Sequence, residues 1–358
     1  MTQITTIGLD LAKNVFQVHG VDADGQVLLR KRLRRSQMLT FFKTLSPCLI
    51  GIEACATAHY WAQTLQSLGH DVRLISPAYV KPYVKRQKND AADAAAICEA
   101  VSRPTMRFAP VKSVEQQSTL MLHSARELLI TQRTALINAI RAHFSELGIV
   151  VAEGARNVRS LLALLQHREE KMNSSAQVPE IAVTALQPLA EMLIETDRQI
   201  AKLDRAIVEM HRDSETSNRL ATIPGIGVLT ATYMTASLAA FAKQFSCGRE
   251  FAAYLGLVPR QYSSGGKPRL GRISKMGNRH LRKLLVVGAT AALYSIRKGT
   301  SQSALALWAR QLLAKKPFRL VAVALANKMA RIAWAVIIHK RDYEVDIKTN
   351  SSTNIITA

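Results

Sequence analysis

The chain has 358 residues, 48% of them hydrophobic, which is enough for two or three domains with cores of their own. A formal charge of +22 and a pI near 10.2 predict a polyanionic partner, and nucleic acid is the usual one. The four cysteines are far apart and form no Cys-x-x-Cys pair, which argues against a disulfide framework and predicts a reducing, cytoplasmic setting.

Two other classes of protein are disfavoured. Cys55 and His59 are four apart on a predicted helix, but two ligands do not make a zinc site, so both are expected to pack. The most apolar stretch, 320–338, is interrupted by Lys328 and Arg331, which favours a core helix over a membrane span. The N-terminus shows no signal-peptide pattern, and no membrane partner is expected.

The first part of the chain, 1–109, has the pattern of a compact α/β domain. Short β-branched and apolar runs alternate with helical periods, and an Asp-Ala-Asp-Gly turn at 22–25 joins two of the runs as a hairpin. The predicted strands are 4–9, 15–21, 26–33, 49–52 and 71–75, and the predicted helices are 37–45, 57–68 and 90–101.

The second part, 110–216, is predicted to be helical. Apolar residues at helical spacing mark one long helix around 120–140 and another over 186–210. Two long helices joined by a shorter segment indicate a helical hairpin or coiled-coil arm. Such an arm could pair two protomers or pack within one chain, and the pattern fits both.

The third part, 217–341, is predicted to be mostly α-helical, with a polar tail at 342–358. Ile-Pro-Gly-Ile-Gly at 223–227 precedes a helix and resembles a helix-hairpin-helix turn, in which the amides of Gly225 and Gly227 would meet DNA phosphate. A plain helix-loop-helix turn is the alternative. The expected helices are 228–238, 249–255, 278–296, 303–315 and 318–339.

Acidic residues are absent from 251–341, a block of 91 positions that holds 18 Lys or Arg. Inside it, a polar Gly-rich loop at 259–278 carries Ser263 and Ser264 directly before Gly265 and Gly266. Such glycines let backbone amides approach a phosphate, and an activated serine can attack one, although a flexible loop is the plainer reading. The cations expected to hold a phosphate backbone are Arg260, Lys267, Arg269, Arg272 and Lys275.

Four acids of the first part have positions that suggest chemistry. Asp10 and Glu53 end two predicted strands, and Asp90 and Asp93 are three apart on one helix face. Carboxylates gathered in one place repel unless cations lie between them, and Mg²⁺ or Mn²⁺ suits oxygen ligands. The alternative is that these acids, Asp93 above all, are simply solvated.

Taken together, these motifs resemble the bacterial insertion-sequence transposases of family one-ten, and most closely their one-eleven-eleven subgroup. The resemblance covers nearly the whole chain. It rests on Gly-Leu-Asp at 8–10, Gly-Ile-Glu-Ala at 51–54, Asn-Asp-Ala-Ala-Asp-Ala at 89–94, Ile-Pro-Gly-Ile-Gly at 223–227 and Gln-Tyr-Ser-Ser-Gly-Gly-Lys at 261–267. Asn89 departs from the threonine of many relatives but leaves the acids untouched.

The resemblance implies an N-terminal domain of ribonuclease-H, RuvC-like fold with a DEDD metal site, and a C-terminal serine transposase domain. Ser264 takes the place of the nucleophile, and Ser263 is its nearest rival. The resemblance also implies double-stranded DNA of the element ends and target, a structured guide RNA from the element, and a homo-oligomer, dimer or tetramer, acting at the bacterial nucleoid.

The resulting hypothesis is a DNA recombinase in which a divalent metal, held by the four acids, assists attack by Ser264 on a phosphodiester. Two rival functions stand beside it. One is a metal-only endonuclease of the Holliday-junction-resolvase type, in which Ser264 is structural. The other is a nucleic-acid-binding protein without catalysis.

Overall fold

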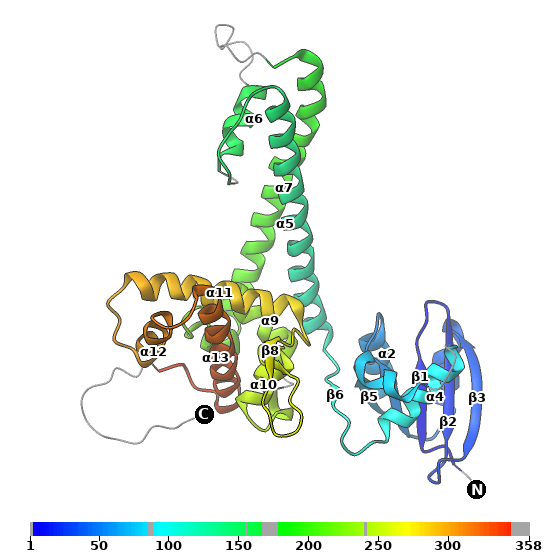
Figure 1. Cartoon of the computed structure of the whole chain (residues 1–358). Coiled ribbons are helices and arrows are strands. Elements are labelled where there is room, and N and C mark those ends of the chain that lie inside the picture. Colours follow the sequence, from blue (N-terminus) through cyan, green and yellow to red (C-terminus); the bar gives the residue numbers. More distant parts are fainter. Residues whose placement is uncertain (1–2, 85–88, 155, 167–177, 240–241, 345–358) are drawn as a thin grey trace, which may run out of the picture. The chain divides into compact units, whose positions relative to one another are not determined.

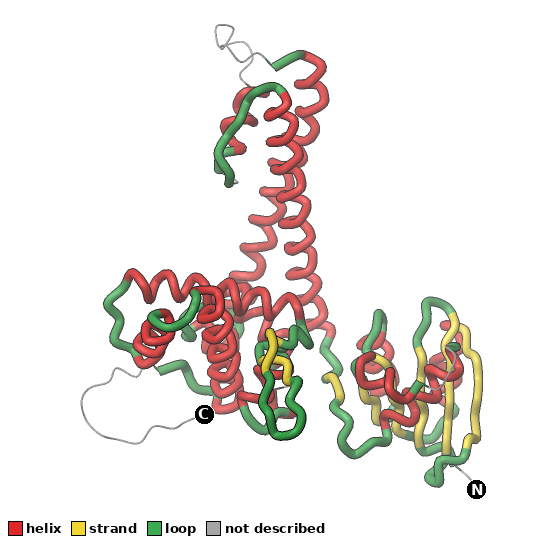
Figure 2. Tube along the Cα trace, viewed as in Figure 1, coloured by secondary structure: helices red, strands yellow, loops and turns green. Residues whose placement is uncertain are grey.

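The computed structural model describes residues 3–84, 89–154, 156–166, 178–239 and 242–344. The chain divides into two compact units, Met1–Gln117 and Ser118–Ala358, which are described separately here (Figure 1). The first is built around a mixed sheet, and the second is mostly helical, as Figure 2 shows by its colours. This order, an α/β domain followed by helices, is the one that the sequence predicts.

A six-stranded sheet forms the centre of the first unit, in the order β3-β2-β1-β4-β5-β6. The strand β1 pairs antiparallel with β2 and parallel with β4, so the sheet changes from antiparallel to parallel there. The strands are β1 (Thr6–Asp10), β2 (Val15–Val21), β3 (Val27–Arg34), β4 (Leu49–Glu53), β5 (Asp71–Ile75) and β6 (Phe108–Ala109). The sequence predicts all of these except β6, which has two residues.

Helices cover both faces of the sheet. On one face, α1 (Met38–Lys43) and α2 (Ala58–Ser67) pack their apolar side chains against alternate residues of the central strands in one buried cluster. On the other face lies α4 (Asp90–Val101), in contact with β1, β2 and β4. Shorter turns of helix complete the unit: η1 (Arg35–Gln37), α3 (Pro77–Val80) and η2 (Lys81–Tyr83).

The long helices α5 (Val114–Glu146) and α7 (Glu180–Arg212) lie side by side as an arm of the second unit (Figure 1). Their far ends share a hydrophobic cluster with α6 (Val158–Gln166), and ion pairs between Arg126 and Asp204 and between Arg133 and Asp197 link them further along. The two helices therefore pack on each other within one chain. The predicted arm is confirmed, while pairing between protomers stays a prediction.

The rest of the second unit is a helical core around α13 (Phe318–His339), which contacts the helices α8, α10, α11 and α12. Length and composition alone would let α13 cross a membrane, yet its apolar residues are part of this core. The other elements are α8 (Glu215–Ala221), α9 (Val228–Leu238), η3 (Ala242–Gln244), α10 (Gly248–Tyr254), α11 (Arg279–Lys298) and α12 (Ala304–Leu313).

The prediction of a loop at 259–278 is wrong in one respect. It contains a β-hairpin of β7 (Pro259–Gln261) and β8 (Leu270–Ile273). Both strands are short and exposed, so they lack the apolar alternation by which strands are found in a sequence. The predicted tail at 342–358 lies outside the described residues from 345 onward.

Candidate active-site groups

Two of the predicted carboxylates end neighbouring strands of the sheet. Asp10 is the last residue of β1 and Glu53 the last of β4, and the two strands pair in parallel. Parallel neighbours end at the same edge, which places both carboxylates there. Because side chains alternate along a strand, Asp10 shares a face with Gly8, and Glu53 shares that face with Gly51.

The two glycines let α4 lie directly on this face. A Cβ added to Gly8 would overlap the carbonyl oxygen of Ala94, and one added to Gly51 would clash with the last turn of the helix. Any larger residue at either position would lift α4 off the sheet. The first turn of the helix, which carries Asp90 and Asp93, is thereby held near the edge where β1 and β4 end.

Asn89 fixes the start of α4. Its side-chain oxygen accepts a hydrogen bond from the backbone N–H of Ala92 at 2.8 Å, so it acts as the N-cap. Asn is as good a cap as the Thr of many relatives, which explains why this departure leaves the helix in place. Asp90 and Asp93 also lie in the first turn, where the helix dipole favours negative charge.

The acids influence one another electrostatically. The pKa of Asp10 is raised from 3.8 to about 6, chiefly by burial and then by repulsion from Asp93, Asp90 and Glu53. A backbone N–H of Leu11 opposes this rise only in part. The other three predicted acids are thus near enough to Asp10 to raise its pKa, while their role as one site stays a prediction.

The cluster suits a divalent cation in its chemistry. Its donors are all carboxylate oxygens, which hard cations such as Mg²⁺ and Mn²⁺ prefer, and a cation would offset the repulsion that raises the pKa of Asp10. Among the residues described, however, no three His, Cys, Asp or Glu side chains lie close enough to form a ready metal site. Binding would therefore require the carboxylates to draw together around the ion.

His59 does not belong to this cluster. Its Nδ1 accepts a hydrogen bond from the backbone N–H of Lys112, and its Nε2 lies 2.9 Å from the Nζ of the same lysine. Burial, with Lys112 nearby, lowers the pKa of His59 to about 4. The four cysteines Cys48, Cys55, Cys98 and Cys247 are free thiols in this structure. The expected packing role of His59 agrees with these contacts.

The serines lie on the hairpin of the second unit. Ser264 and Lys267 face each other across a two-residue turn of Gly265 and Gly266, and the backbone N–H of Lys267 donates to the carbonyl of Ser264 at 3.1 Å. Both glycines have positive φ, of 55° and 74°, with open space where a Cβ would be. The turn therefore requires glycine for its backbone conformation and leaves the surrounding space clear.

The two adjacent hydroxyls have different surroundings. The Oγ of Ser263 accepts hydrogen bonds at 3.0 Å from the backbone N–H of Arg269 and from the side chain of Gln261, across the hairpin. The Ser264 side chain is exposed, and no hydrogen bond to its hydroxyl is found within the described part of the chain. Ser263 thus fastens the hairpin, while Ser264 presents its hydroxyl to solvent.

The predicted cations surround this turn, and none of them pairs with an acid among the residues described. All are exposed. The guanidinium of Arg260 donates to the carbonyl of Ser274 and braces the base of the hairpin, and Lys275 has a positive φ of 56°. The side chains of Lys267, Arg269, Arg272 and Lys275 make no hydrogen bond or ion pair with the described residues.

The base of the hairpin is clamped to the helical core. Arg282 donates to the carbonyls of Leu255 and Met276 at 3.0 and 2.7 Å. A Cβ on Gly256 would overlap the backbone of Met276, and one on Gly277 would overlap the carbonyl of Tyr254. These contacts, which the sequence alone does not reveal, hold the hairpin firmly at its ends and leave its tip free.

A polar cluster at the junction of α5, α9 and α11 also supports the hairpin. Asn278 caps α11 through the backbone N–H of Leu281 and donates to the hydroxyl of Tyr233 at 2.8 Å. On α5, His123 bonds Thr232 and packs edge-on against Tyr233. The arm is thus joined by polar contacts, through Thr232 and Tyr233, to Asn278, the last residue of the serine-bearing segment. These residues were not predicted, because their spacing in sequence is too large.

The two glycines of the turn at 223–227 differ. Gly225 has a φ of 90° and lies against Gly288 of α11, where a Cβ on either residue would clash with the other's carbonyl group. Gly227 is exposed, has open space around it and caps α9. The close packing of this turn on α11 explains why residue 225 is glycine. Phosphate binding by the backbone amides of Gly225 and Gly227 stays a prediction.

Comparison with known proteins agrees with this arrangement. Residues 7–149, which include the four acids, match a transposase family model, and residues 217–305, which include the serine hairpin, match the transposase IS116/IS110/IS902 family. The chain is 40% identical over 336 residues to the transposase for insertion sequence element IS1328 of Yersinia enterocolitica, covering 94% of this chain and 97% of the relative. The chain belongs to the IS116/IS110/IS902 transposase family.

Other relatives extend over similar lengths. The chain is 38% identical over 343 residues to the transposase for insertion sequence element IS1111A of Coxiella burnetii, covering 96% of this chain and 92% of the relative. It is 46% identical over 340 residues to a Pseudomonas aeruginosa protein named "Probable family 20 transposase", covering 95% and 98%. Transposases of this family cut and join DNA, so the predicted enzyme class is confirmed at that level.

Proposed function

We propose that this transposase cuts and rejoins DNA through Ser264, assisted by a divalent ion at Asp10, Glu53, Asp90 and Asp93. The observation that carries the proposal is the contrast between two adjacent hydroxyls. Ser263 is engaged in the hairpin, whereas Ser264 lies exposed at the corner of a glycine turn. Both serines are exposed, but the Ser263 hydroxyl already accepts two hydrogen bonds, whereas the Ser264 hydroxyl has none among the described residues, which favours Ser264 as the nucleophile.

In the proposed reaction, the Oγ of Ser264 attacks the scissile phosphorus and forms a P–O bond. The bond from phosphorus to the 3′ oxygen breaks, the serine proton is lost to solvent or a base, and the 3′ oxygen leaves as a hydroxyl after gaining a proton. Mg²⁺ or Mn²⁺, when bound at the acids, supplies charge stabilisation to the phosphoryl group. The free hydroxyl of a second strand can reverse the link without ATP, because one phosphodiester replaces another.

The exposed cations of the hairpin fit the task of holding the DNA backbone. Lys267, Arg269 and Arg272 present positive charge within a few residues of Ser264 and have no acidic partner among the described residues. Charge on a phosphoryl group would be stabilised by cations held in this way. Binding that relies on such contacts weakens steeply as salt is raised.

Several parts of the proposal rest on the family alone. A guide RNA and a homo-oligomer follow from the sequence resemblance, and the charge of +22 is compatible with binding both DNA and RNA. Action at the nucleoid of a bacterial cell follows from the proposed substrate. The RuvC-like assignment of the first unit is likewise part of the proposal.

A covalent-trapping assay tests the proposal. The protein is incubated with element-end DNA, the flanking RNA and Mg²⁺, and resolved on denaturing gels. We expect an adduct from wild type and from Ser263→Ala, and none from Ser264→Ala or Asp10→Asn. Free DNA ends without an adduct, persisting in Ser264→Ala but lost in Asp10→Asn, would replace the proposal with the metal-only endonuclease. Binding without any cleavage would leave a DNA-binding protein.

A further inference from the structure

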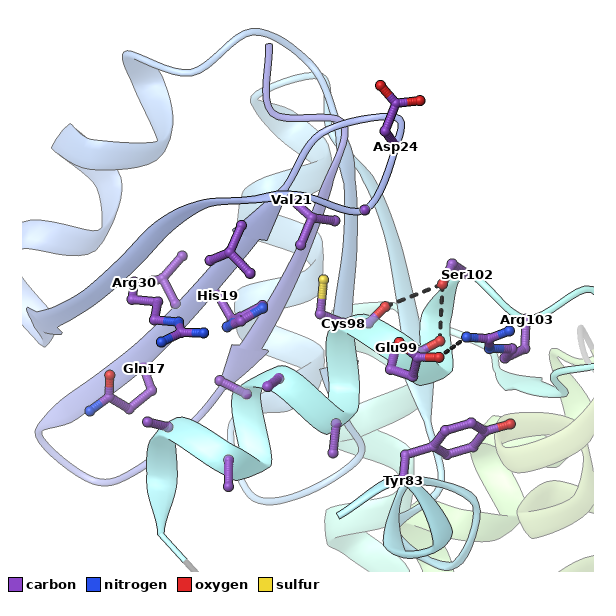
Figure 3. Close-up of a pocket in the computed structure, with 18 of the residues that line it drawn as sticks. Gln17, His19, Val21, Asp24, Arg30, Tyr83, Cys98, Glu99, Ser102 and Arg103 are labelled. Carbon is purple, nitrogen blue, oxygen red and sulfur yellow. Dashed lines mark hydrogen bonds and ion pairs between the residues drawn. The ribbon is translucent and has the colours of Figure 1, made fainter. Parts of the chain in front are cut away.

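A groove of about 690 Å³ runs along the first unit between α4 and the strands β2 and β3 (Figure 3). It exists because α4 lies on β1, β2 and β4 and leaves the edge strand β3 uncovered. The side chains by which α4 lines the groove are small, among them those of Ala91, Ala94 and Ala95. Larger residues at those positions would fill this space, so the sequence of α4 keeps it open.

Polar side chains from the sheet form the floor of the groove. Gln17 and His19 alternate along β2 on the face of α4, and Arg30 is the cross-strand partner of His19 on β3. His19 is only 9% exposed, and its ring has no hydrogen bond within the described part of the chain. Figure 3 shows His19, Gln17 and Arg30 together at one end of the groove. The ring nitrogens of His19 are therefore free to hydrogen-bond a ligand in the groove.

The edge strand β3 is basic along the groove, where Arg30 lines it and Asp24 lines it at the turn between β2 and β3. Arg30, Arg32 and Arg34 share one face of the edge strand, are all exposed and have no acidic partner among the residues described. Their spacing of two residues is roughly 6.7 Å along the strand, similar to the separation of successive phosphates in a nucleic-acid chain. The acid of the opposite wall, Glu99, is already paired with Arg103 on the same helix.

The groove leads to the acid cluster. In the pairing of β1 with β2, Gln17 lies directly opposite Asp10, and Ala91 of the wall lies between Asp90 and Asp93 in sequence. A polymer that enters beside Arg30 and continues past Gln17 would therefore reach the carboxylates. This continuity distinguishes the groove from an isolated pocket for a small molecule.

We propose that the groove binds the DNA strand that leads to the acid cluster, with Arg30 and His19 on one phosphate and Arg32 on the next. The inference rests on the proposed function for the choice of DNA, because DNA is the substrate assigned to those acids. The phosphate contacts themselves follow from the charge and spacing of the edge strand. They add a DNA-binding surface in the first unit to the one expected on the hairpin of the second.

Fluorescence anisotropy with labelled element-end DNA tests the groove without any need for catalysis. The full chain carrying Asp10→Asn serves as the common background. Adding Arg30→Ala with Arg32→Ala is expected to weaken binding about tenfold and to lower the salt slope by about two. The matched control is Lys31→Ala with Lys43→Ala, which removes the same amount of positive charge. Lys31 is on the face of β3 that points away from the groove, with its Nζ over the ring of Phe41. This control is expected to weaken binding about twofold at most.

A second variant tests the groove rather than its rim. Ala95→Phe fills the groove without changing charge, and it is expected to weaken DNA binding about fivefold or more while thermal melting shows a folded chain. Equal losses from the arginine pair and the lysine pair would overturn the proposal, as would unchanged binding in the arginine pair. A loss confined to the flanking RNA would reassign the groove to RNA. Each of these outcomes concerns DNA binding by the groove, so none of them changes the result expected from the covalent-trapping assay of Ser264.

Discussion

The acid-bearing edge of the sheet and the serine-bearing hairpin are built in opposite ways. Asp10 and Glu53 end central strands of a buried sheet, and α4 is pressed onto that sheet at Gly8 and Gly51. Ser264 lies instead at the tip of an exposed two-stranded hairpin that is anchored only at its base. Placement of the acids therefore depends on the core, whereas placement of the serine depends on a local turn.

The difference suits the two chemical roles that we propose. A metal ion needs several carboxylates held against their mutual repulsion, which only packed elements can do. A nucleophile that must approach a phosphate and later release it needs an accessible position more than a buried one. Mutations should accordingly disturb folding in the first region and chemistry in the second.

The largest expected effect is that of Gly8→Ala. The new Cβ would overlap the Ala94 carbonyl, so we expect the free energy of unfolding to fall by about 2–4 kcal/mol. Urea denaturation of the full chain would measure this. Gly265→Ala is the matched change on the hairpin, where space is open but φ is positive, and a cost of about 1 kcal/mol is expected. Equal costs at the two positions would contradict the contrast between the regions.

A second prediction concerns pH and metal. Because the pKa of Asp10 is raised from 3.8 to about 6, the folded chain holds a proton that the unfolded chain has lost between these values. The contribution of Asp10 to stability in EDTA should therefore fall as pH rises through this window. His59, whose pKa is lowered to about 4, acts in the opposite direction, so the Asp10 contribution is taken as the difference between wild type and Asp10→Asn. Mg²⁺ binds the ionised form, so it should restore stability above about pH 6.

Urea denaturation across this window, with and without Mg²⁺, checks the prediction. Asp10→Asn serves as the control, since it should remove the Asp10 contribution to the pH dependence and most of the stabilisation by Mg²⁺. Stabilisation by Mg²⁺ that persists in Asp10→Asn would place the metal elsewhere.

The cations of the hairpin should have intermediate effects. Arg272→Ala, at an exposed position without an acidic partner among the residues described, is expected to weaken DNA binding about fivefold to tenfold and to lower the salt slope by about one. Arg73→Ala is a control, because Arg73 already pairs with Asp71 in the first unit. DNA binding measured at several salt concentrations would distinguish the Arg272→Ala variant from the Arg73→Ala control. A salt-insensitive complex would remove the hairpin cations from DNA binding.

The smallest effect should come from Ser263→Ala. Its Oγ accepts two hydrogen bonds within an exposed hairpin, so a loss of about 0.5–1 kcal/mol in stability is expected, with the adduct retained. Ser264→Ala should leave stability unchanged, because its exposed hydroxyl makes no described hydrogen bond. Thermal melting of both variants compares them. A larger stability loss in Ser264→Ala would mean that its role is structural.

Much of the fold could be predicted because the sequence signals were local. The helix expected at 228–238 is α9, and the five longer strands of the sheet lie within one or two residues of their predicted positions. Apolar periodicity and glycine turns specify such elements directly. The serine hairpin was missed because its strands are polar and exposed, so their pairing depends on the turn and on anchoring by Arg282.

The residues that we propose for the site could be named from the sequence, but the contacts that support them could not. Acids that end apolar strands are conspicuous in a sequence, whereas the role of Gly8 depends on a helix that lies more than 80 positions away. The position of His19 in a groove likewise depends on distant segments, because the groove exists only where α4 leaves β3 uncovered. Contacts between distant segments carry no local pattern, so only the structure reveals them.

The most direct test of the central claim is to locate the covalent bond. Wild-type protein is reacted with element-end DNA and Mg²⁺, the DNA is digested, and peptides covering the hairpin are analysed by mass spectrometry. The account predicts a nucleotide remnant on Ser264, absent when EDTA replaces Mg²⁺ and absent in Asp10→Asn. A remnant on Ser263, or one on Ser264 that forms without metal and without Asp10, would contradict it.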